Sequence, residues 1–310
     1  MRLVSYRKGA EIRAGIERDD RVYDLKAAMK RGKAEVPVSD LRALLEQSSW
    51  KQSLKKIQID ARSAYIPLSK AKLTAPISEP RKLIISGLNS YSHLKELEDL
   101  TGKIEPPRYP MVIGKATSTI SGPYDDIILP PETKKLDYEC ELAVVIGRKC
   151  RRIPADKIRT YLAGYMTMND VSARDVQMAD GQALFYRVHF PGKSFDTFCP
   201  TGPALVTIDE FPKSRVMKMR TLVNGNVRQD ADTADFIFTV QQVISHVSQI
   251  MTLLPGDIIS MGSPAGVIVA DPKPVFLKPG DVVRCEIEGI GSVENPIKAE
   301  RNKVAAFKTG

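Results

Sequence analysis

The sequence predicts an α+β protein dominated by strands, with a small N-terminal α+β domain at residues 1–75 and a larger catalytic domain at 76–310, built as a mixed β-sheet barrel or roll. Two observations predict the larger domain. Short runs rich in β-branched residues recur along it, and the turn-forming sequence Pro-Gly-Asp precedes two of them, at 255–257 and 279–281. The expected strands include residues 204–208, 220–223, 257–260 and 282–287.

Few helices are expected in the larger domain. Helical composition is confined to a segment that starts near Ser92, a segment after Asp170, and residues 238–252. The strands therefore dominate this part of the chain, and the helices are expected at its edges.

The N-terminal region has an organisation of its own. Weak alternation and a turn at 19–20 predict a small meander, followed by two helices. The expected strands are 1–6, 11–17 and 21–25, and the expected helices are 24–29 and 39–54, the second capped by Ser39 or Asp40. Pro67 and Pro76 bracket the boundary at about residue 75. We find no site chemistry before that boundary.

The composition is that of an ordinary globular protein, with 43% hydrophobic residues. No apolar run approaches the roughly 18 residues of a membrane helix, and the N-terminal MRLVSYRKGAEIRAG lacks the apolar segment of a signal peptide. Four scattered cysteines without a C-x-x-C pattern indicate reduced thiols, and so a cytoplasmic protein. These cysteines are Cys140, Cys150, Cys199 and Cys285.

The net charge of +9 raises the question of nucleic acid. However, the basic residues are spread along the chain, and aromatic residues, at 6%, do not interleave with them. No helix-turn-helix, zinc-finger or ribonucleoprotein pattern is present, so we expect no nucleic-acid partner. A positive field that attracts a dianionic substrate explains the charge better, with solubility as the alternative.

Residues 136–147, LDYECELAVVIG, form the most informative segment. Glu139 and Glu141 are two apart in a strand-like run, so their side chains point to the same face, as does that of Asp137. Adjacent buried anions repel, and a hard divalent cation bound by oxygens would relieve the repulsion. The alternative is a charged, solvent-exposed strand edge. On the opposite face, Cys140, Leu142, Val144 and Ile146 are expected in the core.

A third carboxylate follows in the segment 161–178. Residues 163–168 resemble a strand that ends at Asn169 and Asp170, where side chains are often presented for function. Asp170 would complete a set of three oxygen ligands and leave about three positions for water or substrate. The alternative for Asp170 is an Asx turn or a helix cap, with Ser172 as a possible N-cap of the next helix.

An acid–base pair is expected on the helix that starts near Ser92. His93 and Glu96 are three apart and share a helix face. A carboxylate orients an imidazole and raises its basicity. The alternative is an exposed surface pair. His189 and His246 have no such context and are interpreted as structural.

Five motifs occur in an order that resembles the fumarylacetoacetate hydrolase superfamily, and more closely its bacterial two-domain members of the acylpyruvase and hydroxyhepta-diene-dioate isomerase type. The motifs are LDYECELAVVIG, GYMTMNDVSARDVQ, GKSFDTFCPTGP, LLPGDIISMGSPAGV and LKPGDVVRCEIEGIGSVEN. The resemblance runs from about residue 82 to 295, and it implies the family's β-rich catalytic domain. It is specific for the family and much less so for the substrate.

The resemblance also implies roles for individual residues. Glu139, Glu141 and Asp170 match the family's ligands for Mg²⁺ or Mn²⁺, which Ca²⁺ could replace in crystals. The pair His93 and Glu96 matches a catalytic pair on a lid, although Ser90 stands where the family has tyrosine. Residues matching other positions of the site are Lys193 as a catalytic lysine, Arg174, Gln177, Gly262 and Ser263 as substrate-binding residues, and Lys115 in a more weakly matching segment.

The implied reaction is the metal-dependent hydrolysis of a carbon–carbon bond in an acylpyruvate-type 2,4-diketo acid. The partner would be a small 2-keto acid, and the resemblance implies a homodimer. Alternatives are oxaloacetate decarboxylation or tautomerisation, isomerisation of 2-hydroxyhepta-2,4-diene-1,7-dioate, and, ranked lower, ureidoglycolate cleavage. A catalytically silent keto-acid-binding protein is the non-enzyme alternative. Residues 178–192 are expected to shape the distal part of the pocket.

Overall fold

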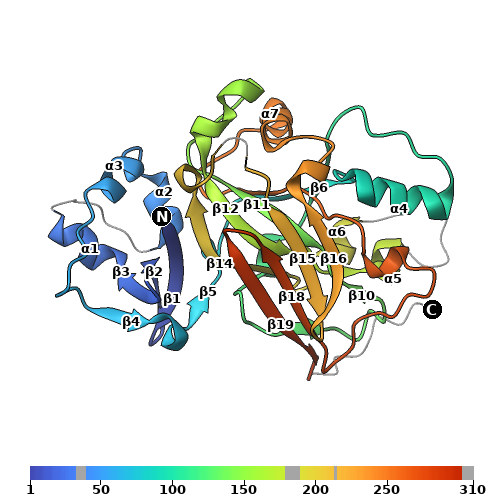
Figure 1. The fold of residues 1–310 in the computed structure, drawn as a ribbon, viewed down its shortest axis with the longest axis horizontal. Helices are drawn as coiled ribbons and strands as arrows, with labels where there is room; N and C mark the ends of the chain where they lie inside the picture. The colour runs from blue at the N-terminus through green and yellow to red at the C-terminus, as the bar shows by residue number, and fades with distance from the viewer. Residues whose placement is uncertain (33–39, 179–188, 213–214, 302–310) are drawn as a thin grey trace.

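The computed structural model describes residues 1–32, 40–178, 189–212 and 215–301. Strands dominate and form three sheets in the described residues, of which the two larger ones face one another, with helices at the periphery (Figure 1). The expected β-dominated α+β class is confirmed. The large sheet is open rather than a closed barrel, because its path runs from β4 to β7 without joining its ends in the described part of the chain.

The N-terminal elements are three strands that form a meander, three short helices and two further strands. Their bounds are β1 Arg2–Lys8, β2 Glu11–Arg18, β3 Arg21–Asp24, α1 Leu25–Arg31, α2 Leu41–Glu46, α3 Trp50–Lys55, β4 Tyr65–Pro67 and β5 Leu73–Thr74. The helix expected over 39–54 is two helices, separated by Gln47 to Ser49. Asp40 is the N-cap of α2, and its carboxylate accepts the Ala43 N–H at 2.8 Å.

The remaining elements carry the proposed site. The helices are α4 Tyr91–Thr101, α5 Arg174–Met178, α6 His189–Lys193 and α7 Val240–Ile250. The strands are β6 Leu83–Gly87, β7 Met111–Gly114, β8 Ile120–Ser121, β9 Ile127–Leu129, β10 Leu136–Asp137, β11 Cys140–Ile146, β12 Leu162–Asn169, β13 Ser172–Ala173, β14 Cys199–Thr207, β15 Lys218–Val223, β16 Asn226–Asp232, β17 Ile258–Ser260, β18 Val282–Ile287 and β19 Gly291–Ala299.

The large sheet is mixed and has 12 strands, with the path β4-β3-β2-β1-β14-β12-β11-β17-β6-β7. Strand β1 pairs with β14, in the register Arg2↔Val206, so the N-terminal meander extends the same sheet. The boundary at about residue 75 stays a prediction. A second sheet of five strands, in the order β16-β15-β18-β19-β9, packs across the first.

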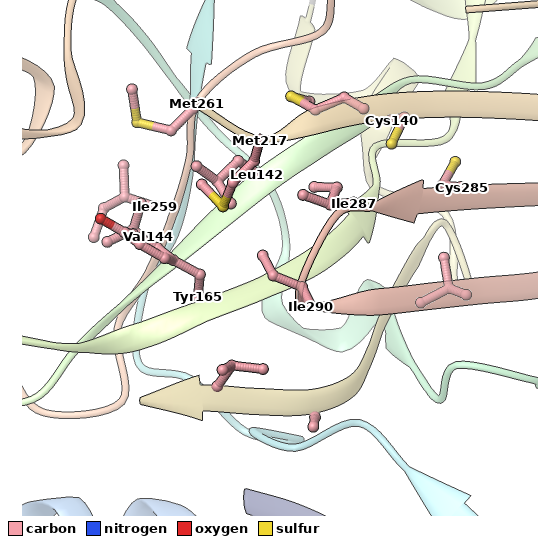
Figure 2. Packing of buried hydrophobic residues seen from close by; sticks show 14 of the residues in the cluster. Cys140, Leu142, Val144, Tyr165, Met217, Ile259, Met261, Cys285, Ile287 and Ile290 are labelled. Carbon is pink, nitrogen blue, oxygen red and sulfur yellow. The ribbon is translucent and has the colours of Figure 1, made fainter. Parts of the chain in front are cut away.

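Strand β11 lies at the centre of the fold and is buried on both faces. On one face, Leu142 and Val144 pack against residues of the second sheet, among them Ile287 (Figure 2). On the other face, Ala143 and Val145 belong to a second core that includes the N-terminal helices. The core residues expected from the sequence are confirmed, and the strand that carries Glu141 is held from both sides.

Trp50 ties the N-terminal helices to this centre. Its indole N–H donates to the carbonyl of Gly147 at 2.9 Å, and its ring is 4% exposed. A Cβ placed on Gly147 would lie 3.0 Å from that ring, so indole and backbone are closely packed.

We therefore expect Trp50→Ala to lower the free energy of unfolding by about 3–5 kcal/mol, because it empties a large buried volume and leaves the carbonyl of Gly147 without its donor. Urea denaturation measures this change. Val275→Ala, at a side chain that is 79% exposed, is the control and should have little effect. A loss below about 1 kcal/mol for Trp50→Ala would contradict this packing role.

Candidate active site

An antiparallel strand pair brings the three expected metal ligands together. Glu139 directly precedes β11 and Asp170 directly follows β12, and the register pairs Cys140 with Asn169. The Asp170 N–H donates to the carbonyl of Glu139 at 2.8 Å, which closes this end of the pair. One carboxylate oxygen each from Glu139, Glu141 and Asp170 lies within 4.8 Å of the others, and all three residues are buried. The solvent-exposed alternative for these acids is therefore wrong.

Arg174, at the start of α5, holds two of the acids. Its Nε donates to Asp137 Oδ2 and its Nη2 to Glu139 Oε1, each at 2.8 Å, while its Nη1 donates to Gln177 Oε1 at 2.9 Å. Asp137 also accepts the backbone N–H groups of Ile268 and Val269. Arg174 is therefore paired with buried acids, and its guanidinium fixes one oxygen of Glu139.

Two buried lysines neutralise the second oxygen of Glu139 and both oxygens of Asp170. Lys193 Nζ donates to Glu139 Oε2 at 2.5 Å, to Asp170 Oδ2, and to the hydroxyl of Ser172 at 3.0 Å. Lys115 Nζ donates to Asp170 Oδ1 at 2.5 Å and to two backbone carbonyls. Ser172 lies in β13 and caps no helix, because its hydroxyl donates to the carbonyl of Asp170.

Glu141 differs from its neighbours because it forms no ion pair within the described residues. The hydroxyl of Ser260 donates to its Oε2. Burial raises the pKa of Glu141 well above its usual value, and the charges of Asp170 and Glu139 add to this increase. Burial also opposes ionisation of Glu139, but Arg174 and Lys193 outweigh it and lower that pKa. An unpaired buried carboxylate beside two paired ones leaves room for one more positive charge.

Several of these groups line a cavity of about 310 Å³. Glu139, Glu141 and Lys193 lie on its wall, together with the residues expected to bind substrate, which are Arg174, Gln177, Gly262 and Ser263. Gly262 has φ +88°, and a Cβ there would lie 2.4 Å from the carbonyl of Ser86, so this turn requires glycine. Apolar side chains complete the cavity: Ile85, Leu88, Leu97, Met111, Ile113, Met178 and Val269.

His93 reaches the same cavity from α4. Its Nδ1 lies 2.8 Å from Glu96 Oε2, as the spacing on the helix predicts. The second oxygen of Glu96 accepts the Gly266 N–H at 2.8 Å, so the pair is attached to the loop that carries Ser263. The surface-pair alternative is wrong, since the side chains of His93 and Glu96 are only 12% and 20% exposed.

The start of α4 is anchored by the segment that follows β16. Ser90 caps the helix, and its hydroxyl donates to Asp235 Oδ2 at 2.5 Å. Asp235 also accepts the Ser92 N–H at 3.1 Å. Asn89, fully buried, donates to the carbonyls of Phe238 and Met261. These contacts fix the position from which His93 enters the cavity.

Several residues of the site have no signal in the sequence. Ser260 and Asp235 lie far along the chain from the residues they contact, and only the fold brings them near. His189, expected to be structural, lines the cavity, with its Nδ1 2.8 Å from Gln177 Nε2. Of the segment expected to shape the distal pocket, residues 179–188 lie outside the described part of the chain, while Met178 and His189 line the cavity.

No helix in the described part of the chain is long and apolar enough to cross a membrane.

Relatives with different named activities resemble this chain. Oxaloacetate tautomerase Fahd2a, mitochondrial, from Rattus norvegicus is 42% identical over 253 residues, which cover 82% of this chain and 78% of that protein. The solved fumarylacetoacetate hydrolase from Exiguobacterium antarcticum is 32% identical with a TM-score of 0.78, covering 97% of this chain and 100% of that one. The solved 2-hydroxyhepta-2,4-diene-1,7-dioate isomerase from Mycobacterium marinum is 30% identical with a TM-score of 0.72, with the same coverage.

A family model also matches this chain. The model for the fumarylacetoacetate hydrolase C-terminal domain matches residues 82–298, which include all the acids, lysines and loops of the candidate site. The chain therefore belongs to the fumarylacetoacetate hydrolase family.

Proposed function

We propose that this protein is a divalent-metal-dependent enzyme that acts on a small 2-keto acid. The observation that carries the proposal is the buried group of Glu139, Glu141 and Asp170, of which the two glutamates lie on the wall of a cavity that His93 also lines. The donor atoms are all carboxylate oxygens, which suit Mg²⁺ or Mn²⁺ and not a softer metal.

The charges of the site favour such an ion. The cluster contains four buried acids and three buried bases, which are Asp137, Glu139, Glu141, Asp170, Lys115, Arg174 and Lys193. With every group ionised, the sum is four negative and three positive charges, or −1. A divalent cation would change the sum to +1. The site would then attract the carboxylate of a substrate that it otherwise repels.

When bound, the ion would polarise the carbonyl of a 2-keto acid and stabilise the enolate charge that develops on it. The chain's own residues have complementary roles. Lys193 places a second positive charge beside Glu139 and Asp170, where it can stabilise the same developing charge. Ser263 and Gly262 lie on the cavity wall, where the resemblance implies contact with the substrate carboxylate.

His93 is the proposed acid–base group. Its Nδ1 is engaged by Glu96, so Nε2 is the nitrogen that can accept or release a proton in the cavity. In keto–enol tautomerisation of oxaloacetate, such a group removes a proton from C3, and a proton is returned to the keto oxygen. No water is consumed. The 42% identity to an oxaloacetate tautomerase favours this reaction as the first candidate.

Hydrolysis of a carbon–carbon bond in an acylpyruvate is the second candidate, and the 32% identity to a solved fumarylacetoacetate hydrolase favours it. The same imidazole would take a proton from water, the resulting hydroxide would attack the distal carbonyl, and the bond to the enolate of pyruvate would break. We further propose a homodimer in the cytoplasm, as expected from the sequence.

A turnover assay separates the two candidates. The metal-free protein would be supplied with Mg²⁺ or Mn²⁺ and tested on oxaloacetate and acetylpyruvate, with an EDTA control. Metal-dependent exchange between enol and keto oxaloacetate, with no new product, would establish the tautomerase. Release of acetate and pyruvate from acetylpyruvate would establish the hydrolase. A metal-loaded protein that is inert on both would contradict the proposed function.

Glu141→Gln should raise the Tm of the metal-free protein and abolish metal binding. Because the pKa of Glu141 is raised in the fold, its stabilising contribution is complete below the unfolded value of about 4.3 and is lost as the pH rises through the raised pKa. At neutral pH the amide of the variant stays neutral, so this loss of stability does not occur. Each 1 kcal/mol gained in the free energy of unfolding would raise the Tm by about 2 °C.

Calorimetric scanning of EDTA-treated protein measures this change, with Glu294→Gln on the exposed side of β19 as the matched control. A lower Tm together with normal Mn²⁺ affinity would show that Glu141 is no ligand.

His93→Ala should lower kcat by about 10²–10⁴ because it removes the acid–base group, while the affinity for Mn²⁺ stays unchanged. Steady-state kinetics and a Mn²⁺ titration measure the two effects. His246→Ala is the control, since that ring stacks on Tyr109 at 6.2 Å and does not line the cavity. An unchanged kcat in His93→Ala would assign the proton transfer to another group.

A further inference from the structure

Gln229 is a buried polar residue in a strand whose first three residues are exposed. Its side chain is 1% exposed, whereas Asn226, Val227 and Arg228 face the solvent. Burial of an amide is costly unless its donors and acceptors are satisfied. The hydrogen bonds of Gln229 therefore show what this residue positions.

The orientation of the amide is fixed by its partners. Gln229 Oε1 accepts the backbone N–H of Cys140 at 3.1 Å and the hydroxyl of Thr221 at 2.7 Å. A backbone N–H can only donate, so the atom facing Cys140 must be the oxygen. The NH₂ group consequently points to the opposite side, toward the loop at 263–265.

That loop accepts the NH₂ group at three oxygens. Gln229 Nε2 lies 2.9 Å from Ser263 Oγ, 2.9 Å from the carbonyl of Pro264 and 3.3 Å from the carbonyl of Ala265. The carbonyls can only accept, which agrees with the assigned orientation. The amide thus joins the strand that carries the metal ligands to the loop on the cavity wall.

The contact with Ser263 decides what its hydroxyl can do. Because Ser263 Oγ accepts a hydrogen bond from Gln229, its own proton must be donated elsewhere. Within the described residues its acceptor is the carbonyl of Pro264 at 3.2 Å, which already accepts from Gln229. Ser263 lines the cavity, so an anionic oxygen placed there would be the stronger acceptor.

We propose that Gln229 is a positioning residue that makes the Ser263 hydroxyl a hydrogen-bond donor to the carboxylate of the substrate. This inference rests on the proposed function, since it requires a carboxylate in the cavity. The same residue also connects the segment that carries Glu139 and Glu141 to the loop at 263–265. Cys140, whose N–H donates to the same amide, lies between Glu139 and Glu141. One planar group therefore fixes the position of the loop at 263–265 relative to β11.

Gln229→Glu removes the NH₂ donor of the amide and keeps its acceptor oxygen. The glutamate retains an oxygen for Cys140 and Thr221 but places a second oxygen against the three acceptors of the loop. The probe is oxalate, a planar dicarboxylate that resembles the enolate of pyruvate, titrated by calorimetry into protein loaded with Mn²⁺. Gln249→Glu, at an exposed position on α7, is the matched control. Gln229→Met, which is neutral and similar in size, is the second variant if the glutamate prevents folding.

A double-mutant cycle with Ser263→Ala supplies the decisive readout. We expect Gln229→Glu to weaken oxalate binding by about tenfold or more in the otherwise unchanged protein, the scale of one hydrogen bond to a charged group. In the Ser263→Ala background the same substitution should weaken it by less than about twofold, with the affinity for Mn²⁺ little changed. The Tm should fall in both backgrounds, because the glutamate places a buried oxygen against acceptors.

The contrary outcomes are distinct. An equal loss in both backgrounds would show that Gln229 acts on the general structure, and no oxalate binding by the Mn²⁺-loaded parent protein would remove the carboxylate site itself. Either result overturns the inference. If oxalate binding shows the expected coupling but the protein is inert on oxaloacetate and acetylpyruvate, the proposed function fails while the role of Gln229 stands.

Discussion

The site depends on the cost of burying negative charge. A carboxylate withdrawn from water is stable only beside positive charge or hydrogen-bond donors, and this protein buries four of them in one cluster. Arg174 and Lys193 neutralise Glu139, and Lys115 neutralises Asp170. Among the described residues, Glu141 has only the hydrogen bond from the Ser260 hydroxyl. The proposed metal, the attraction of an anionic substrate and the need for a rigid surrounding core all follow from this one imbalance.

The fold supplies that rigidity. Strand β11 is packed on both faces, so the backbone that carries Glu141 cannot retreat toward solvent to relieve the repulsion. The second sheet also contributes to the site, because Gln229 on β16 contacts the loop at 263–265. Asp235, just after β16, contacts the start of α4. Acids on the large sheet, an imidazole on α4 and a loop between them are therefore held in one arrangement, although they are distant in sequence.

The sequence predicted what depends on local periodicity. Alternation along a strand placed Glu139 and Glu141 on one face, and helical spacing placed His93 beside Glu96. It did not predict contacts made by the tertiary fold, such as Ser260 with Glu141 or Gln229 with Ser263, because Ser260 and Gln229 carry no local signal. The break of the helix expected over 39–54 was missed for the same reason, because it is decided by packing between distant segments.

The central claim is that a divalent cation completes the group of Glu139, Glu141 and Asp170. The most direct test is the anomalous difference density of a crystal grown from EDTA-treated protein and soaked in MnCl₂. The account predicts one strong peak per chain, within coordination distance of all three carboxylates, at about 2.0–2.6 Å. Density only at exposed acids, or none in the cavity at saturating Mn²⁺, would contradict it.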